Sequence, residues 1–257
     1  TYTNAVYTGN FQGSFDGLGN TISGIRLVNS CTSTCNIGFF AQASGGAKIS
    51  NLLLNEIFTL TGPSSGSASY SNYAVGGLVG RVTGGTSAAP NTFSGNGITF
   101  VQNTSNVSTL SINGYWGGGI IGQTYGASAV YSQISNSFAS LNVNNTNVLG
   151  ITASSIGGIV GDASASTSGS AGGSGGLINI SSTYVSGNIQ VKQAGYWGVG
   201  GLIGQAYGTP VVANNSYTYF EPGSLTSTSG TISVGGLMGW ATSLTLTNSY
   251  STYGSNA

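Results

Sequence analysis

Gly76-Gly77-Leu78-Val79-Gly80 is the stretch that decides the fold, because close copies of it recur along the chain. The four copies that match it best are Gly118-Gly119-Ile120-Ile121-Gly122, Gly157-Gly158-Ile159-Val160-Gly161, Gly200-Gly201-Leu202-Ile203-Gly204 and Gly235-Gly236-Leu237-Met238-Gly239. A degenerate first copy is Ile37-Gly38-Phe39-Phe40-Ala41. The copies follow one another at intervals of about 40 residues, a period typical of repeat architectures. We therefore interpret the chain as about six copies of one Gly-rich unit.

A second short segment follows most copies and places Asn or Ser before an apolar or aromatic residue. Its copies are Ile49-Ser50-Asn51-Leu52, Ile134-Ser135-Asn136-Ser137-Phe138, Ile180-Ser181-Ser182-Thr183-Tyr184, Ala213-Asn214-Asn215-Ser216-Tyr217 and Leu246-Thr247-Asn248-Ser249-Tyr250. Both segments are short, rich in β-branched or aromatic residues and bounded by Gly, Asn or Ser, which is typical of strands. Strands too short to bury their own apolar face are stabilised by stacking on the next copy. The pattern predicts an all-β fold, a β-solenoid.

The repeat also predicts the domain organisation. We expect residues 1–35 to form N-terminal entry strands of the solenoid and residues 36–257 to form its repeats, in a single continuous domain. No C-terminal cap is recognisable after Tyr250, and the ends of solenoids need polar caps. Two explanations stay open: the chain continues in a longer surface protein, or its end stacks on another copy and builds a filament.

The composition excludes several classes of function. Lys and Arg together number 4, Asp and Glu together number 4, and histidine is absent, so the formal net charge is zero. Such a neutral chain lacks the basic surface that binds nucleic acid, and no apolar run is long enough to insert into a membrane. Hydrophobic residues make up 39% of the chain, which argues for a folded protein.

The four carboxylates argue against an enzyme. Asp16, Glu56, Asp162 and Glu221 are spread over different repeats, whereas cleavage of a polysaccharide normally needs a pair of carboxylates. We expect them to be solvated or to cap local turns. Serine has no histidine to activate it. We therefore predict no catalytic residue, no cofactor and no metal site.

The two cysteines are separated by three residues, in Cys31-Thr32-Ser33-Thr34-Cys35. In a chain of secreted character a disulfide is favoured over free thiols, and a metal site lacks the further ligands it would need. Possible N-glycosylation sequons begin at Asn103, Asn106, Asn144, Asn179 and Asn214. A composition this rich in Asn, Ser and Thr also produces such sequons by chance.

Aromatic residues flank the Gly-rich motif in two of its copies. These candidate contact residues are Tyr115, Trp116 and Tyr125 around one copy and Tyr196, Trp197 and Tyr207 around the other. A row of such residues packs a corner of the fold, forms a protein contact or stacks on a sugar. The sequence leaves these three alternatives open.

The two motifs together resemble the GLUG repeat of large bacterial surface proteins. The opening Phe11-Gln12-Gly13-Ser14-Phe15-Asp16-Gly17-Leu18-Gly19-Asn20-Thr21-Ile22-Ser23-Gly24 is similar to the segment that often introduces these repeats in adhesin-like and filamentous-haemagglutinin-like exoproteins. The resemblance implies extracellular or cell-surface display and a right-handed parallel β-helix, and it supplies no catalytic residues. The chain departs from the family in having so few acidic residues.

We therefore expect an extracellular structural protein. It would be a cell-surface adhesin module or a filament-forming subunit that acts by self-association and surface contact. The alternative is a carbohydrate-binding β-helix module that uses exposed aromatic residues to bind host or cell-surface glycans.

Overall fold

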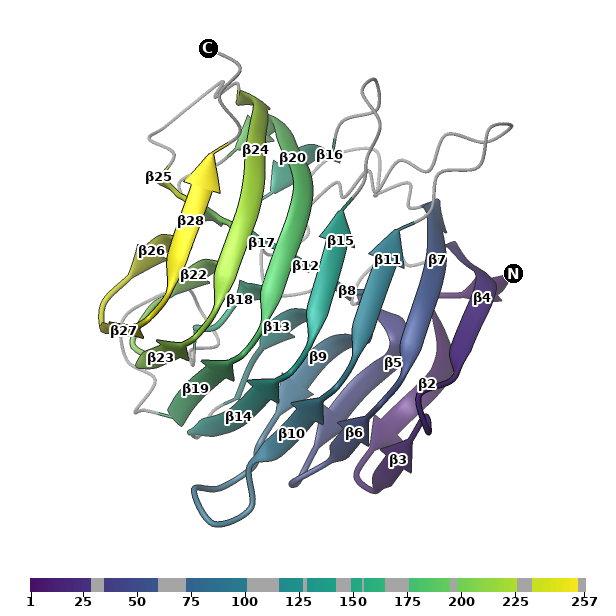
Figure 1. Cartoon of the computed structure of the whole chain (residues 1–257). Helices are drawn as coiled ribbons and strands as arrows, with labels where there is room; N and C mark the ends of the chain where they lie inside the picture. The colour runs from purple at the N-terminus through teal and green to yellow at the C-terminus, as the bar shows by residue number, and fades with distance from the viewer. Residues whose placement is uncertain are drawn as a thin grey trace.

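The computed structural model describes residues 1–28, 35–59, 73–100, 116–126, 129–141, 149–153, 155–164, 176–194, 198–225 and 233–253. All regular structure in these ranges is β-strand, so the predicted all-β class is confirmed. Because no described residue is helical, none of these ranges contains a helix that could span a membrane. The strands form three sheets of parallel strands, which we call sheets I, II and III (Figure 1).

The three sheets take one strand after another from successive repeats. Sheet I contains β1 (Tyr2–Thr3), β4 (Thr21–Val28), β7 (Leu53–Thr59), β11 (Gly97–Phe100), β15 (Phe138–Leu141), β20 (Tyr184–Ala194), β24 (Tyr217–Leu225) and β28 (Tyr250–Tyr253), with β16 (Leu149–Ala153) also beside β20. Sheet II contains β3 (Ser14–Asp16), β6 (Lys48–Ser50), β10 (Asn91–Ser94), β14 (Val130–Ser135), β19 (Gly176–Ser181), β23 (Val211–Asn214) and β27 (Leu244–Thr247).

Sheet III consists of two rows joined by the long strand β5 (Cys35–Ser44). In one row, β2 (Ala5–Phe11) and β9 (Val79–Thr83) both pair with β5. The row continues from β9 through β13 (Ile121–Thr124), β18 (Val160–Asp162), β22 (Ile203–Ala206) and β26 (Met238–Ala241). The other row contains β8 (Tyr73–Gly76), β12 (Trp116–Gly118), β17 (Ser155–Gly157), β21 (Gly198–Gly200) and β25 (Ser233–Gly235).

Nearly all strands pair with the strand one repeat later, and the register is regular apart from shifts within four of the strand pairs. Val79 pairs with Ile121, Ile121 with Val160, and Val160 with Ile203. The colours of Figure 1 therefore change in chain order across each sheet. We call the strands that one repeat contributes a level; the first level is β1 to β4 and the last is β25 to β28.

The Gly-rich motif joins the two rows of sheet III by a very short turn. A Cβ atom added to Gly76 would collide with the carbonyl oxygen of Val79, and the same collision recurs between Gly118 and Ile121. None of the five glycines that open the motif copies has a positive φ. Their role is therefore to allow close approach of backbone to backbone, a known use of glycine in strands.

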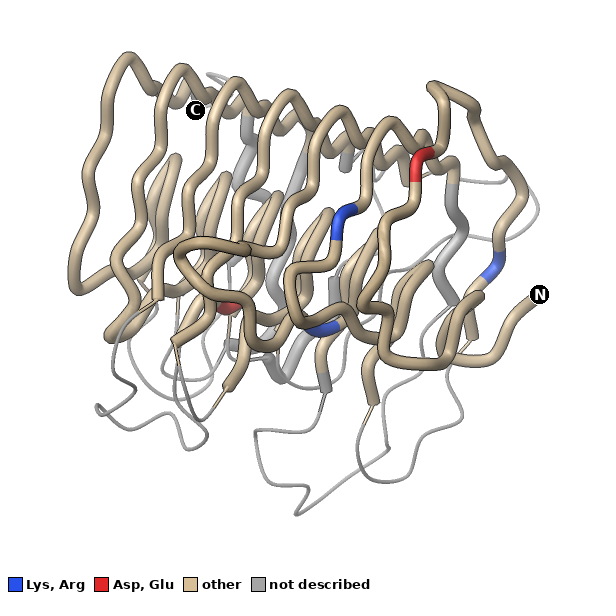
Figure 2. Tube along the Cα trace, turned by 90° about the horizontal axis from the view of Figure 1, so that it is seen from below, with Lys and Arg blue, Asp and Glu red and all other residues tan. Residues whose placement is uncertain are grey.

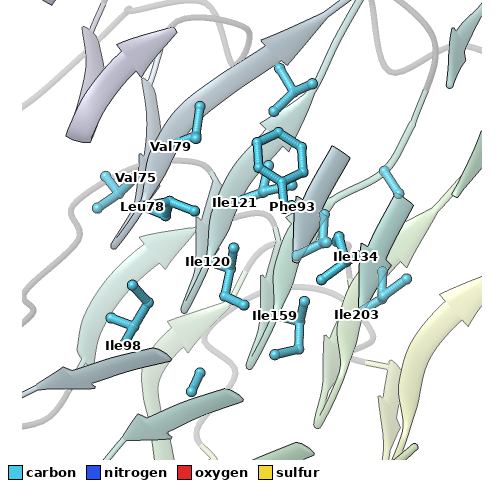
Figure 3. Close-up of a cluster of buried hydrophobic side chains, with 14 of the residues drawn as sticks. Val75, Leu78, Val79, Phe93, Ile98, Ile120, Ile121, Ile134, Ile159 and Ile203 are labelled. Atoms are coloured by element: carbon cyan, nitrogen blue, oxygen red, sulfur yellow. The ribbon is translucent and has the colours of Figure 1, made fainter. Parts of the chain in front are cut away.

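The apolar pair of each motif fills the core. Leu78, Val79, Ile120 and Ile121 are fully buried, together with Phe93 and Ile134 from sheet II and Ile98 from sheet I (Figure 3). Burying one such side chain stabilises a fold by about 1.5–3 kcal/mol. Residues of all three sheets thus share one core, which continues through the later levels with Ile159, Val160, Leu202 and Ile203.

Candidate functional site

A line of polar residues runs through sheet III directly after the motif. Gln42, Arg81, Gln123, Asp162 and Gln205 each follow the last residue of a copy, and the register places each beside the next. We call this line the polar column. Its Arg81, Gln123, Asp162 and Gln205 side chains are buried. The charged residues of the described ranges are otherwise few and scattered along the trace (Figure 2).

Hydrogen bonds connect the polar column from one level to the next. Gln123 donates its Nε2 hydrogen to Oδ2 of Asp162 at 3.1 Å. The backbone N–H of Ser164 donates to Oδ1 of Asp162 at 3.0 Å. Ser155 Oγ donates to Oε1 of Gln205 at 2.8 Å, and Gln205 Nε2 donates to Oγ of Ser164 at 3.3 Å. The column is therefore a buried network that joins both rows of sheet III.

Burial controls the electrostatics of this network. It raises the pKa of the Asp162 carboxyl from 3.8 to about 6, and the hydrogen bonds from Ser164 and Gln123 and the charge of Arg81 act in the opposite direction. Burial also lowers the pKa of the Arg81 guanidinium, whose central carbon lies 4.8 Å from the centre of the Tyr125 ring. Within the described residues no group of three His, Cys, Asp or Glu side chains could hold a metal ion.

The carboxylates do not form a pair where the structure describes them. Asp16 is exposed on sheet II and accepts hydrogen bonds from the Leu18 N–H at 2.8 Å and from Nδ2 of Asn51 at 3.0 Å. This is the local capping that the sequence predicts. Asp162 also caps a backbone N–H but is buried, so a solvated Asp162 is wrong. The side chains of Glu56 and Glu221 lie outside the described part of the molecule.

The candidate contact aromatics occupy different environments. Trp116 on β12 is only 8% exposed, which agrees with the packing alternative. Tyr125 is half-buried beside Arg81, and Tyr207 is half-buried with its ring centre 5.3 Å from that of Trp240. Tyr115, Tyr196 and Trp197 lie outside the described residues.

A second row of aromatic residues, on sheet I, was missed at the sequence level. The rings of Phe138, Tyr184, Tyr217 and Tyr250 stack in order, with centroids 5.2, 5.4 and 5.6 Å apart. We call it the aromatic row. Each member is the final residue of a second-segment copy, so the signal was present as a repeated position. The rings cover one another's faces, and on Tyr217 and Tyr250 they leave about 39% and 57% of the side chain exposed.

The Asn and Ser residues of the second segment form a turn between sheets II and I. Asn51, Asn136, Ser182, Asn215 and Asn248 all have φ near +50°, between +47° and +52°. Asn adopts this left-handed conformation more readily than most residues because its side chain bonds locally.

The residue after this turn bonds to the neighbouring level. Ser137 Oγ accepts the Asn96 N–H at 3.2 Å, Ser216 Oγ accepts the Thr183 N–H at 3.3 Å, and Ser249 Oγ accepts the Ser216 N–H at 3.2 Å. We call this line, together with the turn residues, the corner ladder. The conspicuous Asn and Ser of the second segment are therefore used to join levels.

The modification sites are only partly described. Cys35 is buried and disulfide-bonded, and Cys31 lies outside the described residues, so their pairing stays a prediction. Asn179 and Asn214 are half-buried on inner strands of sheet II. Asn103, Asn106 and Asn144 lie outside the described ranges.

Comparison with protein-family models, with curated proteins and with solved structures finds no match to this chain. The resemblance to GLUG repeats therefore rests on the two motifs and the opening segment of the sequence alone.

Proposed function

We propose that the chain is a parallel β-helix of the solenoid type that serves as an extracellular structural protein. It works by self-association and surface contact, as a filament-forming subunit or as an adhesin module at a cell surface. One observation carries the proposal: the repeated residues contact the equivalent residue one repeat away. Gln123 bonds to Asp162, Ser216 bonds to Ser249, and Tyr184 stacks on Tyr217.

This use of side chains supports a structural role over catalysis. A carboxylate that works as general acid or base must reach its substrate, usually with a second carboxylate opposite it. Asp162 is buried and its oxygens accept bonds from Gln123 and Ser164. Repeats whose polar and aromatic side chains connect adjacent levels are suited to a long, regular structural protein.

Composition supports the extracellular location. The Cys35 disulfide is typical of an oxidising compartment, and the surface relies on hydroxyl and amide groups in place of charges. The resemblance to GLUG repeats points in the same direction. Secretion is tested by cell fractionation of the source cells with an antibody raised against the chain; protein confined to the cytosol would contradict it.

Self-association is tested by sedimentation velocity over a wide range of protein concentration, combined with electron microscopy. We expect the sedimenting mass to rise with concentration and threads to be visible at the highest concentrations. Discrete monomers at every concentration would exclude the filament subunit and leave the adhesin module, which is then tested by binding of the labelled chain to cells.

Carbohydrate binding is the second candidate, and exposed tyrosines on sheet I favour it. Tyr217, Tyr219 and Tyr250 lie on adjacent strands and are 39%, 49% and 57% exposed. A glycan panel probed with Tyr219→Ala and Tyr250→Ala tests this candidate, with Thr245→Ala on sheet II as control. Binding that is absent, or equal in all variants, would end it.

A further inference from the structure

Exposed apolar residues gather on the first and last levels of the molecule. Among the described large hydrophobic residues that are exposed, only Tyr217 and Tyr219 lie elsewhere; the others are Tyr2, Tyr7, Leu18, Ile22, Val234, Trp240, Leu244, Leu246 and Tyr250. In the described part of the chain, the partly exposed hydrophobic residues that pack on the core also belong to these levels: Val6, Phe11, Phe15, Leu237, Met238 and Ala241. The two ends of the described sheets thus carry the apolar surface.

On the last level these residues occupy the positions that belong to the core in the level before it. Leu244 and Leu246 of β27 pair with Val211 and Ala213 of β23. Val211 and Ala213 are 1% and 2% exposed, whereas Leu244 and Leu246 are 38% and 44% exposed. The intervening Thr245 lies in register with the half-buried Val212, on the outer side of sheet II.

The first level shows the same feature with the opposite edge open. Tyr7, Phe15 and Ile22 are in register with Phe40, Ile49 and Leu54, which are all buried in the core. Tyr7 is 44% exposed and Ile22 is 36% exposed. Phe15 belongs to the same line of residues as Leu246, and Tyr7 to the same line as Met238, as the successive pairings of sheets II and III show.

We propose that the last level of one copy stacks on the first level of a second copy, with β26, β27 and β28 beside β2, β3 and β4, so that the three sheets continue across the junction. In sheet I, β1 pairs only with Leu27 and Val28 of β4, and the register places β28 beside the other end of β4, which begins at Thr21. This inference rests on the proposed self-association and names the surface that performs it. Apolar positions of one end would cover apolar positions of the other, and the open edges would pair in parallel as inside the chain. This contact joins two different surfaces of the same chain, so each pair of copies still has one free first level and one free last level. Further copies can therefore add at both ends, and the sheets continue along a filament.

Three observations favour a second copy over an unrelated partner. The edge strands at both ends belong to the same three sheets and run in the same direction, so the register of the internal levels can be kept. The last level, residues 233–253, contains no charged residue, so no ion is buried at the junction from that side. The first level carries Asp16 and Arg26 only, and Asp16 lies on the exposed side of sheet II. A carboxylate introduced at Leu246 or Ile22 would therefore be buried at the junction, and the last level offers it no positive charge as a partner.

The test uses one blocked variant for each end. Leu246→Asp blocks the last level and Ile22→Asp blocks the first, and each has a control on the outer side of the same strand, Thr245→Asp and Thr21→Asp. We expect both blocked variants to be folded by circular dichroism, and to need an at least tenfold higher concentration for assembly, since a buried unpaired charge costs more than the 1.4 kcal/mol that tenfold represents. The controls should assemble like the unmodified chain.

Mixing the two blocked variants in equal amounts gives the decisive result. Each retains one intact end of the opposite kind, so the mixture should form dimers and nothing longer, while each variant alone stays monomeric. If the blocked variants fold and still assemble like the unmodified chain, the proposed junction between the first and last levels is wrong, although self-association itself remains supported. Dimers of one variant alone, or a mixture without dimers, would overturn it too. An unmodified chain that never assembles would remove the filament proposal and the junction together.

Discussion

The corner ladder and the polar column both join one level to the next by side-chain hydrogen bonds, but they differ in how regularly one residue type repeats. The corner ladder uses Asn, Ser or Thr at nearly every level, and its first level carries the exposed Asp16. The polar column changes residue type from Gln42 to Arg81 to Gln123 to Asp162 and is buried over most of its length. The corner ladder repeats one kind of residue because each level needs the same turn. The polar column varies because its hydrogen-bond network involves only a few levels.

The difference has an electrostatic consequence. The Leu18 N–H and the Asn51 amide lower the pKa of the Asp16 carboxyl below 3.8, whereas burial raises the pKa of the Asp162 carboxyl to about 6. A carboxyl with a lowered pKa adds stability above pH 3.8 and loses it on acidification. A carboxyl with a raised pKa has the opposite effect, because the folded chain binds the proton more tightly than the unfolded chain.

The largest expected effect comes from breaking the corner ladder. Ser137→Ala removes the oxygen that accepts the Asn96 N–H, and both residues are buried. A buried donor left without a partner costs about 1–3 kcal/mol. Denaturant unfolding should show this loss equally at pH 5 and pH 8, since no titrating group is involved. Ser94→Ala on the outer side of β10 is the control; an equal loss there would show that the ladder contributes nothing special.

The second effect concerns the polar column and has the opposite sign. Asp162→Asn should stabilise the fold at pH 7.5 by on the order of 2 kcal/mol, because the buried charge is removed. Gln123 can turn its amide to accept the new N–H, since its Oε1 atom is buried and has no hydrogen-bond partner.

The pH dependence identifies the cause of that gain. The unmodified chain should lose stability as the pH rises from about 4 to above 6, whereas Asp162→Asn should not. The two proteins should therefore be similar in stability near pH 3.5. Unfolding curves at four pH values check this, and a gain that is equal at all of them would contradict a titrating Asp162.

A smaller effect is expected in the aromatic row, which repeats like the corner ladder but is exposed. Tyr217→Leu removes a ring that stacks on Tyr184 at 5.4 Å and on Tyr250 at 5.6 Å. Aromatic pairs contribute about 0.5–1.5 kcal/mol beyond their burial. Tyr219→Leu on the same strand is the matched control. The melting temperature should fall more for Tyr217→Leu; equal falls would mean that stacking adds nothing.

The smallest effect is expected at Asp16, where solvent screens the charge. Asp16→Asn should remove the part of the acid sensitivity that Asp16 causes, so the variant should lose less stability than the unmodified chain between pH 5 and pH 2.5. Melting temperatures over this range measure the difference. A steeper acid loss in the variant would reverse the sign assigned to Asp16.

The sequence was sufficient for the all-β class and for the position of the strands around each motif. Glycine and apolar residues recur at fixed places there, because backbone contacts at Gly76 and Gly118 exclude any side chain. It also indicated the turn residues of the second segment. Asn51 and Asn136 stand out since few other residues tolerate φ near +50°.

The polar column and the aromatic row were harder to predict, for two different reasons. The residues of the polar column differ from level to level, so no sequence pattern marked Asp162 as buried and its charge predicted a solvated side chain. Its burial depends on groups from other levels, such as the amide of Gln123. The row was missed although its members recur at one position of the second segment, because Phe138 and Tyr184 lie 46 residues apart and stack only through pairing in register. Trp116 was a candidate contact residue because it is a large aromatic residue beside the motif, but its side chain is buried in the structure.

Constant register also shapes the kinetics of folding. The bonded partners Ser216 and Ser249 are 33 residues apart, and Asn96 and Ile49 are 47 apart, so each level closes a loop of similar length wherever it lies. The entropy of closing such loops changes slowly with their length, so adding a level should cost about the same at every step. Folding can then begin at any adjacent pair of levels and grow outward, as in a one-dimensional crystal.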